Sequence, residues 1–146
     1  MLLHKKLQLR RGLGWRAVPL GRGRAERGVW QVFPRDAAAL GLVRDARWKI
    51  PPSPVEWSVR PQLARPLAVR RADGLGLIAV LMSEPEGCFA VAMPHHDEPY
   101  HSLYLSLFGH TVRAGETARA RDALAVLGAS ELPRVPAIYA WWRPGQ

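Results

Sequence analysis

Hydrophobic and polar residues alternate with a period of two along most of this chain, a pattern typical of β-strands. Glycine-rich segments separate the early apolar runs and mark turns, because glycine adopts the backbone angles that tight turns need. These runs are expected to form edge-like strands of an antiparallel sheet, and they fall at residues 3–10, 15–20 and 29–33.

The next segment departs from this alternation. Residues 34–42, PRDAAALGL, predict a helix of one to two turns, because proline and aspartate favour a first turn and alanine favours the interior. Gly41 is expected to end that helix. Residues 50–66 contain five prolines, which predicts an extended connection with one short strand at 55–59.

Two hairpins follow. Residues 67–71 and 75–82 flank Ala72-Asp73-Gly74, a turn signal in which glycine can take a positive φ. Residues 75–82 are apolar on both faces, so they are expected in the middle of a sheet that is covered on both sides. The turn at 83–87 then leads to a return strand at 88–93.

Residues 102–109 alternate cleanly. His101, Leu103, Leu105 and Leu107 point one way, and Ser102, Tyr104, Ser106, Phe108 and His110 point the other. The leucines predict the packed face. The opposite face suits a half-wet surface or a polar ligand, and we assign Tyr104, Ser106 and His110 to ligand binding.

The C-terminal part adds one strand and one terminal element. A turn at 113–115 predicts a strand over 116–127, in which Asp122 shares a face with Ala118, Ala120, Leu124 and Val126. Asp122 is expected near the sheet end, or paired with an arginine if it is buried. Residues 133–142 predict a short helix or an extended tail whose Tyr139, Trp141 and Trp142 cover an open edge of the core.

Together these elements predict an all-β fold, an antiparallel β-sandwich of roughly nine short strands with one or two short helices. The length of 146 residues is that of a single domain, which we place over residues 1–146.

Composition narrows the class of protein. The single cysteine, Cys88, excludes an internal disulfide and a cysteine zinc cage, and its apolar surroundings predict a buried structural thiol. The N-terminus lacks the apolar core of a signal peptide, and the longest apolar run is too short to span a bilayer. We therefore expect a soluble cytoplasmic protein with no membrane partner.

The net charge of +9 raises the hypothesis of nucleic-acid binding. The nearest approach to a basic patch is a set of N-terminal arginines: Arg10, Arg11, Arg16, Arg22, Arg24 and Arg27. Arginines are spread along the chain as far as Arg143, and solvated side chains on loops and strand ends explain them equally well. This distribution argues against a nucleic-acid partner, which stays an alternative.

The run 101–109, followed by Arg113-Ala114-Gly115-Glu116-Thr117, resembles the late strands of carbohydrate-associated β-supersandwich domains of the galactose mutarotase-like type. The resemblance covers about forty residues, 88–127, and it implies a carbohydrate ligand. The chain lacks the second histidine on a later strand of that pattern, which argues against an epimerase activity. The same block is similar to bacterial families to which no activity is attached.

Titratable side chains concentrate in one loop, which holds His95, His96, Asp97, Glu98 and His101. Sugar chemistry needs a general acid and a general base on opposite sides of the ring, and His96, His101 and Glu98 are the catalytic candidates. The alternatives are a solvated loop and a metal site, since imidazole and carboxylate groups also ligate metals. We assign no metal and no cofactor to the chain.

A second constellation is the segment WQVFPRD, residues 30–36. Trp30 could stack on a sugar face and Arg35 could bind its polar groups, so both are assigned to ligand binding. A capped helix start with Trp30 in the core is the structural alternative.

The function expected from the sequence is binding of a carbohydrate or another polar small molecule, with sugar processing as an extension. A non-catalytic accessory or interaction domain is the competing class. An enzyme or lectin is expected to show a concave pocket, and an interaction domain a flat exposed apolar patch.

Overall fold

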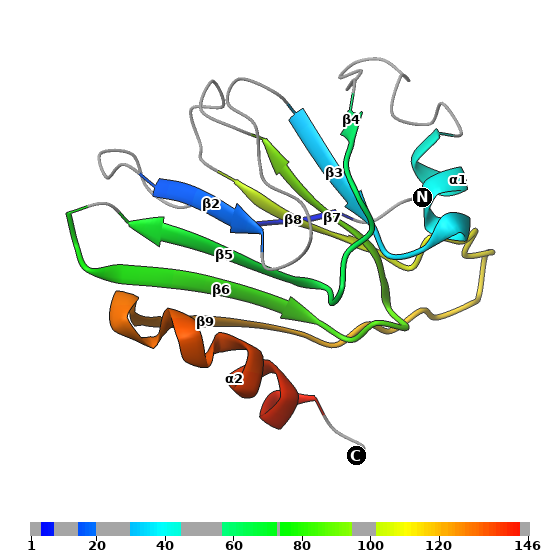
Figure 1. The fold of residues 1–146 in the computed structure, drawn as a ribbon. Coiled ribbons are helices and arrows are strands. Elements are labelled where there is room, and N and C mark those ends of the chain that lie inside the picture. The colour runs from blue at the N-terminus through cyan, green and yellow to red at the C-terminus, as the bar shows by residue number, and fades with distance from the viewer. Residues whose placement is uncertain are drawn as a thin grey trace.

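A computed structural model describes residues 4–7, 15–19, 30–44, 57–72, 74–94 and 102–143. These residues form two sheets and two α-helices (Figure 1). The first sheet has the strand order β1 (His4–Leu7), β8 (Leu103–Leu107), β7 (Cys88–Pro94), β3 (Trp30–Pro34) and β4 (Ser58–Val59). The second has the order β2 (Trp15–Pro19), β5 (Leu67–Ala72), β6 (Leu77–Ser83) and β9 (Asp122–Gly128).

Neighbouring strands are antiparallel, except that β3 and β4 pair in parallel. The prediction of a mainly β chain with one or two short helices is therefore confirmed, and the predicted antiparallel pairing holds for every described strand pair except β3 and β4.

Side chains from the two sheets meet in one apolar cluster. Leu105 of β8 and Val91 of β7 belong to it together with Ala68 of β5 and Leu81 of β6. Alternation explains this, because every second residue of a strand points to the same face. The remaining buried members of this cluster are Phe33, Leu63, Cys88, Met93, Leu103 and Leu107.

Each helix covers the opposite face of one sheet. In α2 (Val135–Trp142), Val135 and Tyr139 pack on Val69 and Val80 of the second sheet. The Tyr139 hydroxyl donates to the backbone oxygen of Ser83 at 3.0 Å, so this buried phenol is satisfied. In α1 (Ala37–Arg44), the buried Ala39 and Val43 join an apolar cluster of the first sheet that includes Val32, Phe89 and Ala92.

The expectation for residues 75–82 is confirmed, with the strand beginning at Leu77. β6 lies between β5 and β9, its Ile78 and Val80 face α2, and its Leu81 faces the other sheet. The preceding turn holds Gly74 and Gly76 at φ +88° and +63°, the backbone region that glycine was expected to supply.

The boundaries of α1 and β9 differ most from the predicted ones. Gly41 does not end α1, which continues to Arg44, because Leu42 and Val43 beyond it pack on the sheet. Tertiary packing thus outweighs the roughly 1 kcal/mol that an interior glycine costs a helix. Of the strand expected at 55–59, Ser58 and Val59 form β4, and residues 55 and 56 lie outside the described residues.

The second difference concerns β9, which starts six residues later than expected. Ala123, Ala125 and Leu127 of β9 are partly buried and pack on the apolar cluster that α2 covers. Leu124 and Val126 point to the other face and are 47% and 58% exposed. Leu124 and Val126 lie on the same face of β9 as Asp122, as the alternation predicted. They occupy an edge strand, where no described strand faces them.

The C-terminal segment is the helical alternative of the two expected. It covers a sheet face, with Tyr139 buried and Trp142 partly buried. Trp141 is 85% exposed, so the prediction that it covers the core was wrong. Asp122 opens β9 opposite Ser83, which places it at the sheet end as one of its two expected positions.

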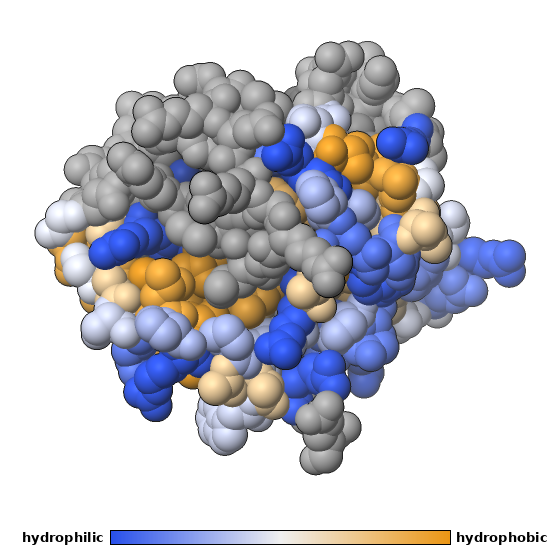
Figure 2. All heavy atoms as spheres, viewed as in Figure 1, coloured by the Kyte–Doolittle hydropathy of each residue, from blue (hydrophilic) through white to orange (hydrophobic). Residues whose placement is uncertain are grey.

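Figure 2 shows hydrophobic side chains at the surface over β5 and β6 and near β4 and α1. No helix in the described ranges is long and apolar enough to cross a membrane.

Candidate functional site

A pocket of about 250 Å³ lies where three segments of the chain converge. These are the start of α1, the connection from β4 to β5, and the turn between β6 and β7. Its lining residues are Arg35, Asp36, Gln62, Leu63, Ala64, Arg65, Pro66 and Pro85.

Backbone hydrogen bonds hold these segments together. The Arg35 amide donates to the Phe89 oxygen of β7 at 2.8 Å, and the Leu63 amide donates to the Pro34 oxygen at 2.9 Å. Arg35 and the connection from β4 to β5 are thus tied to the first sheet. The buried side chain of Leu63 further anchors the connection in the core between the sheets.

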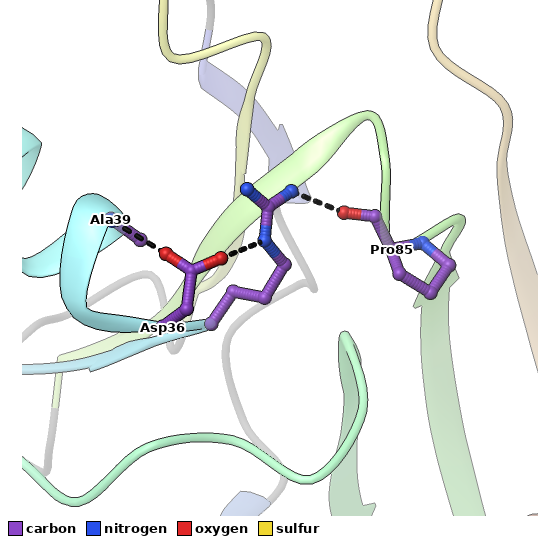
Figure 3. A network of polar contacts seen from close by, with 4 residues as sticks. Asp36, Ala39 and Pro85 are labelled. Carbon is purple, nitrogen blue, oxygen red and sulfur yellow. Dashed lines mark hydrogen bonds and ion pairs between the residues drawn. The ribbon is translucent and has the colours of Figure 1, made fainter.

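Asp36 caps the helix that borders the pocket. Its Oδ1 accepts from the Ala39 amide at 2.7 Å, as an aspartate does at a helix N-cap (Figure 3). The other carboxylate oxygen, Oδ2, accepts from Arg35 Nε at 2.8 Å. The Ala39 amide and then the Arg35 guanidinium lower the pKa of Asp36, so this carboxylate stays charged and is unsuited to act as a general acid.

The Arg35 guanidinium is held from two sides. Nε is bonded to Asp36, and Nη1 donates to the Pro85 oxygen at 2.5 Å across the pocket wall (Figure 3). Nη2 has no hydrogen-bond partner among the described residues. A fixed cation with spare donor capacity is suited to a ligand oxygen, because little side-chain entropy is lost on binding.

Two further polar side chains line the pocket, Gln62 and Arg65, and both are exposed. Arg65 Nη1 donates to the Pro136 oxygen at 3.4 Å, and its guanidinium carbon lies 5.9 Å from the centre of the Tyr139 ring. The Gln62 amide adds donors and an acceptor. The site therefore offers mainly donors, with leucine and proline surfaces between them.

The sequence predicted one of these lining residues as a ligand-binding residue, Arg35. Trp30, its expected companion, is the first residue of β3 and pairs with Pro94. Gln62, Arg65 and Pro85 were missed. The proline-rich stretch around residues 50–66 was the available signal, but it predicts only a connection, and the partners come together through tertiary contacts.

The residues predicted for the ligand face of β8 occupy different environments. Tyr104 is partly buried beside the cluster that α1 covers, and Ser106 is fully buried. His110 is exposed and lies beyond the end of β8, after Phe108 and Gly109 have turned the chain at φ +70° and +63°. Its Nδ1 is 2.9 Å from the Phe108 oxygen. A ligand role for these three residues stays a prediction.

The histidine loop, with His95, His96, Asp97, Glu98 and His101, lies outside the described residues. Of the N-terminal arginines, Arg16 is in β2, and the other five lie outside the described residues. Within the described ranges, no group of three or more histidine, cysteine, aspartate or glutamate side chains could hold a metal ion.

Cys88 is a free, fully buried thiol, as its apolar surroundings predicted. Its Sγ donates to the Ala90 oxygen at 3.2 Å, and burial raises its pKa to about 12. Because the thiolate is the nucleophilic form, Cys88 is unreactive at neutral pH.

Comparison with protein-family models, curated proteins and solved structures finds no match to this chain.

Proposed function

We propose that this chain binds a carbohydrate or another polar small molecule in the pocket at Arg35. The observation that carries the proposal is the Arg35 guanidinium at the wall of the pocket. Asp36 and Pro85 fix it, and its second terminal nitrogen is bonded to none of the described residues. We further propose that the two sheets form a β-sandwich, which their shared apolar cluster supports.

The dimensions and polarity of the pocket favour a ligand about the size of a single sugar ring. About 250 Å³ is below the usual range for drug-sized ligands, about 300–1,000 Å³. Hydroxyl and carboxylate oxygens of such a ligand match the donors of Arg35, Gln62 and Arg65. None of the described lining residues is aromatic, which favours recognition by hydrogen bonds over ring stacking.

The test is titration of the protein with neutral hexoses and hexuronates, followed by calorimetry and amide chemical shifts. Arg35→Ala is expected to weaken binding by about 1.5–3 kcal/mol, the value of a hydrogen bond from a charged group. Gln62→Ala tests the same pocket without touching a described structural bond. Arg71→Ala, which removes an exposed arginine outside the pocket, is the matched control and should leave affinity unchanged.

Absence of binding to every sugar, or equal affinity in wild type and Arg35→Ala, would contradict the proposal. Sugar processing by His96, His101 and Glu98 is a separate prediction. It requires that the protein forms a product from the sugar, and that substitution of His96, His101 or Glu98 abolishes product formation while ligand binding persists.

The second candidate is an interaction domain, and one observation favours it. Large apolar side chains are exposed at the β9 edge of the second sheet, where Leu124 and Val126 lie. An exposed apolar edge is uncommon in a protein that works alone.

A further inference from the structure

Strand β9 is the last strand of the second sheet in the described part of the chain, and its outer edge faces no described strand. Unpaired strand edges template further pairing unless lysine, proline, a bulge or a covering element blocks them. Between Asp122 and Gly128, β9 reads ALAVL, with no proline and no charge. The side chains from Ala123 to Leu127 therefore include none of the devices that protect an edge, and the one charge of the strand is at its first residue, Asp122.

The hydrogen-bond register shows which backbone groups lie on that edge. The Glu84 amide donates to the Arg121 oxygen, and the Ala129 amide donates to the Gly76 oxygen. Both bonds join directly opposed residues, and in an antiparallel ladder such bonded pairs recur every two residues. The backbone N–H and C=O groups of Ala123, Ala125 and Leu127 are therefore directed to β6. Those of Leu124 and Val126 point away from β6, toward the open edge.

Apolar side chains flank this edge on both faces of the sheet. On the inner face, Leu124 stands opposite Leu81 and Val126 opposite Ala79, yet both are about half exposed. On the outer face is α2, whose Pro136 oxygen accepts from Arg65, two residues before β5. Ile138 lies about 200° around the helix from Pro136, which directs it toward the β9 side, whereas Trp141 is 85% exposed and points further toward solvent.

We infer that the β9 edge binds a second copy of this chain, with the two β9 strands antiparallel and related by a two-fold axis at Ala125. Leu124 of one copy then stands opposite Val126 of the other. The outward backbone N–H and C=O groups of these two residues hydrogen-bond to each other across the interface. The strand is thus complementary to itself, in register and in the side chains that meet.

Charge supports a second copy as the occupant despite the net charge of +9. The charged residues nearest to β9 are Arg119, Arg121 and Asp122 at its start, and Glu131 and Arg134 in the 3-10 helix that follows Gly128. Antiparallel pairing brings the first group of one copy toward the second group of its partner, three positive and two negative charges. The charges near the contact are therefore mixed, and most of the excess positive charge of the chain lies away from it.

The experiment is sedimentation of the full chain from low to high micromolar concentration. We expect a reversible monomer–dimer equilibrium, because one strand of seven residues offers a limited contact, whereas a standard stable interface buries roughly 800 Å² per partner. Val126→Lys adds an edge charge, and Leu124→Pro removes an amide directed away from β6. Each is expected to weaken the dimer by about tenfold or more while the monomer stays folded by circular dichroism.

Leu75→Lys is the matched control, because Leu75 is also 47% exposed but lies in the turn before β6. It should leave the dissociation constant unchanged. A chain that stays monomeric throughout, or a dimer equally stable in Val126→Lys and wild type, overturns the inference. Dimer loss only in Leu75→Lys places the interface elsewhere and overturns it as well.

Discussion

At the scale of single residues, the turn that ends β8 is the most constrained backbone in the described chain. Phe108 and Gly109 both have positive φ, +70° and +63°, a region that costs an L-residue about 1–2 kcal/mol. A Cβ on Gly109 would come within 2.8 Å of Leu42 Cδ1 and 2.9 Å of Phe89 Cδ1. Glycine is therefore required at 109 by conformation and by space.

Gly109→Ala is accordingly expected to destabilise the fold by about 2–5 kcal/mol, the sum of backbone strain and overpacking against α1 and β7. Gly74→Ala is the control, because Gly74 has φ +88° but no atom within 4 Å of the added methyl group. It should cost only the strain, about 1–2 kcal/mol. Urea unfolding of both variants measures the difference, and equal losses would show that the space around Gly109 is not limiting.

At the scale of elements, α2 is attached to the second sheet by one buried polar contact within an apolar cluster. Tyr139 packs on residues of β5 and β6, and its hydroxyl donates to the Ser83 oxygen at 3.0 Å. Burial raises the pKa of Tyr139, so the phenol stays protonated and remains a donor at neutral pH.

Tyr139→Phe is expected to cost about 1–3 kcal/mol, because the Ser83 oxygen loses its donor while the ring still packs. Tyr139→Ala also loses the ring and should cost about 3–5 kcal/mol. Thermal or urea unfolding distinguishes the two. If Tyr139→Phe unfolds like wild type, the hydroxyl contact adds nothing to the attachment of α2.

The same scale shows what the sequence could predict. β5, β6 and β7 were located to within two residues, because apolar runs between glycine or proline turns suit few alternatives. The start of β9 and the end of α1 were predicted less accurately, because both depend on which parts of the fold pack against these elements. The pocket was predicted only through Arg35, because Gln62, Arg65 and Pro85 approach it from segments separated in sequence.

At the scale of the whole molecule, the central question is whether the two sheets behave as one cooperative unit. Ala68 and Leu81 of the second sheet share a buried cluster with Leu103, Leu105 and Leu107 of β8. A shared core couples the sheets, because disordering one exposes apolar surface of the other. This is the physical content of the prediction that residues 1–146 form one domain.

Leu105→Ala tests this coupling from the first sheet. Leu105 is fully buried, so its truncation should cost about 2–5 kcal/mol. If the chain unfolds as one unit, the slowest-exchanging amides of β6 and of β8 should lose the same free energy of protection, although Leu105 lies only in β8.

We expect β6 to hold the slowest amides in the wild type, because it is an interior strand with both faces buried. Hydrogen exchange in wild type and Leu105→Ala measures both. Loss of protection in β8 with β6 unchanged would show that the sheets unfold separately, and the proposed β-sandwich would fail with it.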